Sequence, residues 1–117
     1  MTNEAKIFPI HEIPWVDLGG GHLDKAMVTD PKTGMIVNVS HYPKGYKMGW
    51  HKHSCAHGMY IIEGAMKTNL GIVKKGEFVW FPAGVEMDHG ATQRRIAPFC
   101  SSPTRLLILK GWMADHP

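Results

Sequence analysis

Short apolar segments rich in β-branched and aromatic residues alternate with turn residues along the whole 117-residue chain. Segments of this kind, bounded by glycine or proline, are typical of strands. No window of about a dozen residues carries the apolar repeat of a helix without an interrupting Gly or Pro. The chain is therefore expected to be all-β, an antiparallel sandwich or barrel. The predicted strands are 25–29, 35–42, 46–53, 57–63, 65–70, 77–81, 88–93 and 105–112.

Turn residues punctuate the chain evenly and mark no linker between two domains. The 13 glycines and 8 prolines are spread along the sequence, as in the links 30–34 and 82–84. Proline cannot donate to a strand ladder and glycine permits positive φ, so both links are expected to separate strands. The length also suits one domain. We expect a single domain over 1–117, made of an N-terminal arm (1–24), a barrel (25–112) and a loose tail (113–117).

The N-terminal arm is too apolar to remain free in water. A run of three glycines at 19–21 predicts a loop, and it is preceded by six apolar residues: Ile7, Phe8, Ile10, Ile13, Trp15 and Val16. We expect these side chains to cover the outside of the barrel or to pack on a second copy. Because an open-edged barrel favours pairing, the expected assembly is a homodimer.

Composition and charge exclude several classes of function. Hydrophobic residues make up 44% and charged residues 20%, as in ordinary globular domains. The net charge of +3 is scattered, which argues against a nucleic-acid partner. No apolar stretch approaches the ~18 residues that span a membrane, and the N-terminus does not resemble a signal peptide. Cys55 and Cys100 form no CxxC pair, so we expect reduced thiols and a cytoplasmic protein.

Three of the 8 histidines fall between residues 51 and 57. In a strand, His51 and His53 project to the same face, with Cβ atoms roughly 6–7 Å apart. Two imidazoles at that spacing can converge on one metal ion, with bonds of ~2.0–2.2 Å. A tight turn through 54–56 would return the chain antiparallel, so that His57 faces the same point from the next strand.

A fourth candidate ligand, His89, follows the turn at 82–84. A strand that begins after this turn can enter an antiparallel barrel beside the strand of His51 and His53. The predicted metal ligands are therefore His51, His53, His57 and His89. Apolar side chains that line the site would exclude water and strengthen its electrostatics. The candidates for this lining are Met48, Trp50, Met59, Ile61 and Phe81.

The other histidines receive a plainer interpretation. A histidine on an apolar face is usually a hydrogen-bonded core residue, and this interpretation is kept for His11, His22, His41 and His116. His41 is also a candidate to support a metal ligand from behind. No general base stands out, so the catalytic residues are not predicted.

Two stretches of the sequence resemble the two motifs of the cupin superfamily. The first motif reads G-x5-HxH-x3,4-E-x6-G, and Gly45 to Gly64 match it at every spacing, with His57 in place of the glutamate. The second reads G-x5-PxG-x2-H-x3-N, and Gly76 to Gly84 match its first half. Met87 stands where that motif has histidine, and His89 comes two residues later. Because methionine is a soft ligand, His89 stays the predicted one.

The resemblance implies an antiparallel double-stranded β-helix, the jelly-roll barrel. A histidine in place of the glutamate is similar to the small four-histidine manganese cupins, which implies one divalent transition metal. Manganese or iron is preferred, and nickel, copper and zinc remain open. The superfamily includes dioxygenases that cleave diketones and hydroxyketones, lyases, isomerases and pure binding domains.

We expect a metal-dependent dioxygenase whose partner is a small oxygenated substrate, such as a diketone or hydroxyketone. An electron-poor ion with open coordination positions suits a bidentate substrate and O2. A metal-dependent lyase or isomerase is one alternative, and a non-catalytic small-molecule binding or sensor domain is the other.

Overall fold

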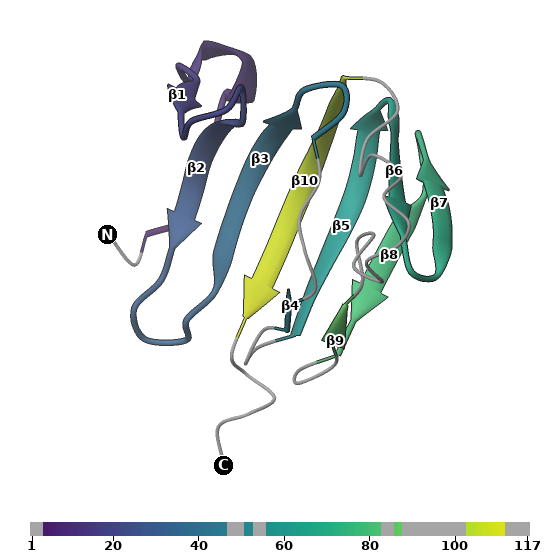
Figure 1. Ribbon diagram of the computed structural model, residues 1–117. Helices are drawn as coiled ribbons and strands as arrows, with labels where there is room; N and C mark the ends of the chain where they lie inside the picture. The colour runs from purple at the N-terminus through teal and green to yellow at the C-terminus, as the bar shows by residue number, and fades with distance from the viewer. Residues whose placement is uncertain (1–3, 47–50, 53–55, 83–85, 88–102, 112–117) are drawn as a thin grey trace.

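The computed structural model describes residues 4–46, 51–52, 56–82, 86–87 and 103–111. These residues form antiparallel strands, which confirms the all-β fold class (Figure 1). The largest sheet has the order β1-β2-β3-β10-β5-β8. Its strands are β1 (Val16–Asp17), β2 (Leu23–Thr29), β3 (Ile36–Tyr42), β10 (Thr104–Gly111), β5 (Ala56–Glu63) and β8 (Phe78–Phe81). Two strand pairs complete the fold: β4 (His51–Lys52) with β9 (Glu86–Met87), and β6 (Ala65–Thr68) with β7 (Gly71–Lys74).

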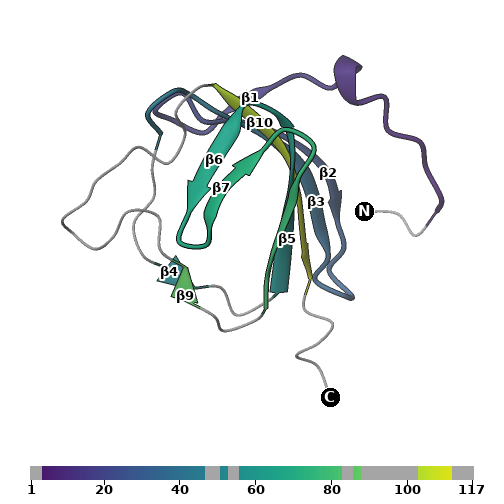
Figure 2. The same ribbon diagram turned by 90° about the vertical axis from the view of Figure 1, so that its right-hand side faces the viewer.

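The two small pairs face the large sheet and form the second layer of the jelly roll. Figure 2 shows β4, β9, β6 and β7 on the inner side of the sheet, while the N-terminal segment runs along its outer side. That segment contains a single turn of 3-10 helix, η1 (Ile10–Glu12). Within the part of the chain that the structure describes, no helix is long and apolar enough to cross a membrane.

Strand β10 holds the two halves of the large sheet together. It pairs with β3 on one side and with β5 on the other. Leu106 lies opposite Ser40 and Ile61, and Ile108 lies opposite Asn38 and Met59. Because side chains alternate along a strand, Leu106 and Ile108 share the inner face with their partners.

The core lies between the two layers. Both contribute to it, because Met66 of β6 and Val73 of β7 pack against residues of the large sheet. Ile61, Met66 and Leu106 have no exposed surface. Burying such a side chain stabilises the fold by about 1.5–3 kcal/mol. The core cluster consists of Tyr42, Met59, Ile61, Met66, Val73, Val79, Phe81, Leu106 and Ile108.

Most predicted strands are confirmed within a residue or two, and three short ones, β1, β7 and β9, were missed. The segment expected to be one strand at 65–70 ends at Thr68, and the chain turns into β7. The Thr68 hydroxyl stabilises this turn, because it accepts from the Leu70 amide at 3.1 Å and donates to the Gly71 carbonyl at 2.8 Å. Strand β1 was also missed. The predicted strand 88–93 lies outside the described residues, as does most of 46–53.

The expectation for the apolar N-terminal arm is confirmed only in part. Trp15 is partly buried against the outer face of the sheet, where its ring lies 6.0 Å from that of His41. Ile7 remains 90% exposed, and Val16 is 57% exposed. The arm therefore attaches to the barrel through the Trp15 ring, through the hydrogen bond from Lys25 to the Ile10 carbonyl and through the pairing of β1 with β2.

Two glycines with the same backbone angle provide a matched test of the packing. Gly64 and Gly76 both have φ +84, so alanine at either costs about 1–2 kcal/mol of backbone strain. A Cβ at Gly64 would also collide with the Pro103 carbonyl and the Thr104 side chain, whereas nothing lies within 4 Å at Gly76.

We therefore expect Gly64→Ala to lower the free energy of unfolding by roughly 1–3 kcal/mol more than Gly76→Ala. Denaturant unfolding of both variants measures the difference. Equal losses would show that the β5–β6 turn is not packed against the start of β10.

Candidate functional site

The interior face of β5 carries the first of the predicted ligands. His57 is only 3% exposed, and its Nδ1 is completely buried. It lies opposite Phe81 of β8, and the two rings stack with centroids 5.4 Å apart and planes at 28°. This stacking fixes the plane of the imidazole. The barrel therefore holds a buried imidazole at the position where the cupin motif has a carboxylate.

Strand β4 brings the second of the predicted ligands to the same end of the barrel. His51 lies directly opposite Met87 of β9 in an antiparallel pair. This confirms that the segment after the turn at 82–84 enters beside the strand of His51. Both ribbon views place β4 and β9 level with the beginning of β5, where His57 lies (Figures 1 and 2). His51 and His57 thus belong to facing layers at one end of the barrel.

The remaining site predictions are only partly covered by the structure. His53, His89, Met48 and Trp50 lie outside the described residues, and only the backbone of His51 is described. Among the side chains that are described, no three of the His, Cys, Asp and Glu type are grouped closely enough to hold a metal. The other candidate lining residues, Met59, Ile61 and Phe81, belong to the core cluster.

His41 does not support a metal ligand, because it lies on the wrong face of the sheet. It is opposite Arg105 of β10 and in contact with Trp15, on the outer face, while its neighbour Tyr42 lies in the core. Burial lowers the pKa of His41, and the nearby Arg105 lowers it further. The alternation of side chains along the predicted strand 35–42 already implied this opposite placement.

A row of polar groups follows the inner face of β2 and β3. The Asp24 carboxylate accepts hydrogen bonds from the Asn38 amide at 2.7 Å and the Ser40 hydroxyl at 2.9 Å. The bond to Asp24 fixes the orientation of the Asn38 amide, because only its nitrogen can donate. Asn38 Oδ1 is buried and has no hydrogen-bond partner among the described residues. This oxygen can therefore accept a hydrogen bond from a bound molecule or water.

His22 continues this row beside two tyrosines. Its ring lies 4.9 Å from that of Tyr42 and 5.4 Å from that of Tyr46, and the two tyrosines stack at 4.5 Å. Its Nε2 is buried without a hydrogen-bond partner among the described residues. Burial lowers the pKa of His22 below 6.5, although the nearby Asp24 acts in the opposite direction. The sequence alone showed no signal for this row, because Asn, Ser and Asp are ordinary surface residues.

The lowered pKa of His22 predicts a loss of stability in acid. The unfolded chain binds a proton at His22 more readily than the folded chain does, so stability rises with pH. This contribution is lost as the pH falls from about 6.5 through the lower pKa of the folded state. We expect His22→Gln to flatten the fall in unfolding free energy between about pH 7 and pH 5. Denaturant unfolding measures both slopes, and identical slopes would contradict the assignment.

Comparison with solved structures shows the same fold in proteins of different activity. A chain in the structure of Rhodobacter sphaeroides SigE in complex with the anti-sigma ChrR matches at 17% identity and TM-score 0.66, over 86% of this chain and 50% of that chain. An acetylacetone dioxygenase from Acinetobacter johnsonii matches at 12% identity and TM-score 0.66, over 93% of this chain and 74% of that chain. The polyketide cyclase RemF from Streptomyces resistomycificus matches at 16% identity and TM-score 0.68, over 92% of this chain and 80% of that chain. This chain thus spans half the length of the first of these.

A sequence comparison with curated proteins finds no match. A family model does match: the ChrR cupin-like domain, over residues 3–101. That range contains both motif stretches and nine of the ten strands. The match agrees with the antiparallel jelly roll that the structure shows. The chain therefore belongs to the family of ChrR cupin-like domains, within the cupin superfamily.

Proposed function

We propose that this domain binds one divalent transition metal inside the barrel through His51, His53, His57 and His89. The observation that carries the proposal is His57, a 3% exposed imidazole on the inner face of β5. A buried histidine that stacks on Phe81 is held ready to bind through a ring nitrogen. The pairing of His51 with Met87 supports the rest of the set, because residues 87 and 89 share a face if the strand continues.

The donor set suits the ion. Neutral imidazoles bind Mn, Fe, Ni, Cu and Zn, and manganese or iron is the preferred assignment in a four-histidine set. A bound ion would supply Lewis-acid polarisation of substrate oxygens and a place to activate O2. Because these ligands include no carboxylate, the site would carry one negative charge fewer than a site built from the usual cupin motif.

The chain's own residues would shape the cavity around a substrate. Met59, Ile61 and Phe81 are apolar and buried, so they exclude water from the inner face of the sheet. Asn38 Oδ1 would accept a hydrogen bond from a substrate hydroxyl across the barrel. A small oxygenated molecule with an apolar body and one donor group fits this combination.

The preferred reaction is oxidative cleavage of a diketone or hydroxyketone. The structural likeness to an acetylacetone dioxygenase supports this choice at the level of the fold. The likeness to a polyketide cyclase supports a non-oxidative, metal-dependent alternative such as a lyase or isomerase. The structural likeness to a chain in the complex of SigE with the anti-sigma ChrR supports a third candidate, a sensor that binds a small molecule without turnover.

Metal content provides the first test. Purified protein loaded with Mn(II) or Fe(II) should hold about one ion per chain by elemental analysis, and should lose it as the pH falls through the titration range of the histidines. The double variant His51→Ala/His53→Ala should lose the ion and stay folded, because the core cluster is apolar. His11→Ala/His116→Ala removes two histidines without an assigned role and should keep it.

A substitution at His57 sharpens this test. His57→Glu restores the carboxylate of the motif and should retain the ion, whereas His57→Leu should lose it. Metal that stays bound at about pH 4, or in His57→Leu, would contradict histidine ligation in the barrel.

Oxygen uptake provides the second test. The protein loaded with Fe(II) or Mn(II) should consume O2 with acetylacetone or with a member of a diketone and hydroxyketone panel, and the metal-free double variant should not. Product formation under strict anaerobiosis would instead favour the lyase or isomerase. Saturable binding without turnover would favour the sensor. No uptake with either metal would contradict the dioxygenase.

A further inference from the structure

The outer face of the large sheet carries a hollow that the proposed metal chemistry does not use. Its volume is about 280 Å³, and its walls are His41, Glu63, Pro103 and Arg105. These residues come from β3, the end of β5 and the beginning of β10, which are neighbouring strands of the sheet. At roughly 30 Å³ for each water molecule, the hollow is large enough for a small organic anion or phosphate.

Arg105 is the cation of this hollow, and Glu63 is its carboxylate. Glu63 is neutralised by Lys75, whose Nζ lies 3.2 Å from its carboxylate. Arg105 forms no ion pair with any residue that the structure describes, and its side chain is exposed. The Arg105 guanidinium also acts on His41, where it disfavours the charged imidazole. Arg105 and His41, two groups that repel each other as cations, thus share one wall. The carboxylate of the lining, Glu63, lies opposite Arg105 in the strand register and is paired with Lys75.

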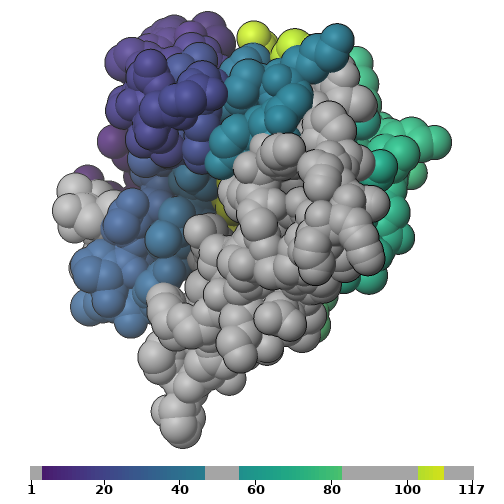
Figure 3. Space-filling model, viewed as in Figure 1, coloured from purple at the N-terminus to yellow at the C-terminus, as the bar shows by residue number. Residues whose placement is uncertain are grey.

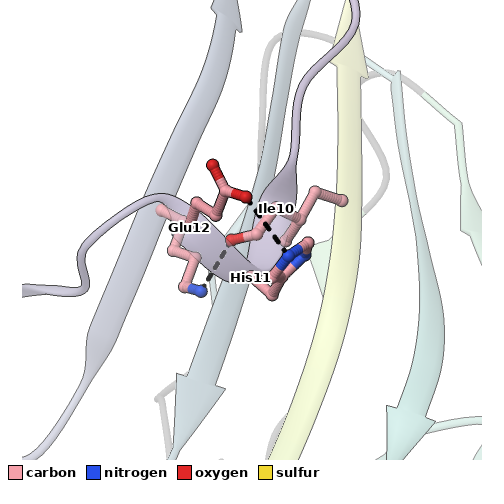
Figure 4. A network of polar contacts seen from close by, with 4 residues as sticks. Ile10, His11 and Glu12 are labelled. Atoms are coloured by element: carbon pink, nitrogen blue, oxygen red, sulfur yellow. Dashed lines mark hydrogen bonds and ion pairs between the residues drawn. The ribbon is translucent and has the colours of Figure 1, made fainter.

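Trp15 keeps this arrangement in place from the N-terminal side. The Arg105 Cζ lies 5.9 Å from the centre of the Trp15 ring, and the Lys25 Nζ lies 4.5 Å from it. Lys25 is only 6% exposed, and its ammonium donates to the Ile10 carbonyl at 2.8 Å. Figure 4 shows the Ile10 carbonyl in η1, together with the ion pair of His11 and Glu12 at 3.5 Å.

Lys25 therefore ties the N-terminal segment to the sheet beside the hollow. The space-filling view shows the N-terminal residues at one upper corner of the molecule, against the strands that follow them (Figure 3). This tether holds an indole over the guanidinium, and an arginine on an aromatic face is restricted in its orientations.

We infer that this hollow binds a small oxyanion, a carboxylate or a phosphate, with Arg105 as its principal partner and His41 as the second. The planar fork of an arginine matches two oxygens of either group. Pro103 supplies an apolar wall on which the body of an organic anion can rest. This site lies on the opposite face of the sheet from His57, so it is independent of the proposed metal centre.

Binding of the anion and protonation of His41 should favour each other. The titratable groups around His41 are Arg105 of β10, Glu63 at the end of β5, and His22, whose pKa His41 lowers. Lys25 of β2 lies over the Trp15 ring that contacts His41. An oxyanion would offset the repulsion from Arg105. The affinity should therefore increase as the pH falls towards the titration range of His41.

The test measures inorganic phosphate and acetate separately, by calorimetry and by the NMR signal of the His41 ring, at constant ionic strength. We expect saturable binding of at least one anion, with a rise in the pKa of His41. Arg105→Gln should weaken this binding by about 10- to 100-fold. Lys32→Gln removes the same charge from the β2–β3 turn, at the far end of β3, and should leave the binding unchanged.

A second variant, which should bind the anion more tightly, tests the inference even if Arg105→Gln folds poorly. Glu63→Gln removes the only carboxylate among the lining residues and should tighten binding by about two- to fivefold. Binding of acetate would identify a carboxylate site, and binding of inorganic phosphate would identify a phosphate site. Binding of neither anion, or equal weakening by Arg105→Gln and Lys32→Gln, would overturn the inference.

Discussion

The pairing of β10 with β3 and β5 is the constraint on which the rest of the structure depends. It joins strands that lie far apart in the sequence, because residues 104–111 are inserted between 36–42 and 56–63. This insertion fixes the inner face of β5 against Leu106 and Ile108, and so places His57 in the barrel. It also brings Arg105 beside His41 on the outer face. Both candidate sites are consequences of one strand register.

The two faces of the large sheet have different chemistry for this reason. The inner face combines an apolar cluster with a buried imidazole and the polar row of Asp24, Asn38 and Ser40. The outer face carries basic side chains around Trp15. A one-residue shift of β10 would exchange Arg105 with Leu106 and disrupt both. The register is therefore under strong energetic control, because a buried arginine is costly.

Local patterns in the sequence predicted much of this fold. Strands β3, β5, β8 and β10 follow from short β-branched and aromatic runs between glycines and prolines, and the fold family follows from the motif spacing. The β6–β7 hairpin was missed, because Asn69-Leu70 is a weak turn signal and the Thr68 hydroxyl supplies what the turn residues lack. The cluster around Trp15 was missed because it depends on pairing between distant strands. Lys25 is buried and donates a hydrogen bond to the Ile10 carbonyl, and no sequence pattern predicts the burial of a lysine.

The central claim is that imidazoles alone hold an ion inside this barrel. X-ray absorption spectroscopy of the zinc-loaded domain tests it most directly, because nitrogen and sulfur ligands give different bond lengths. We predict imidazole nitrogens at ~2.0–2.1 Å, four in number, and no sulfur. A sulfur neighbour at ~2.3 Å, from Met87 or Cys55, would contradict the assignment of His89 and of an all-histidine site.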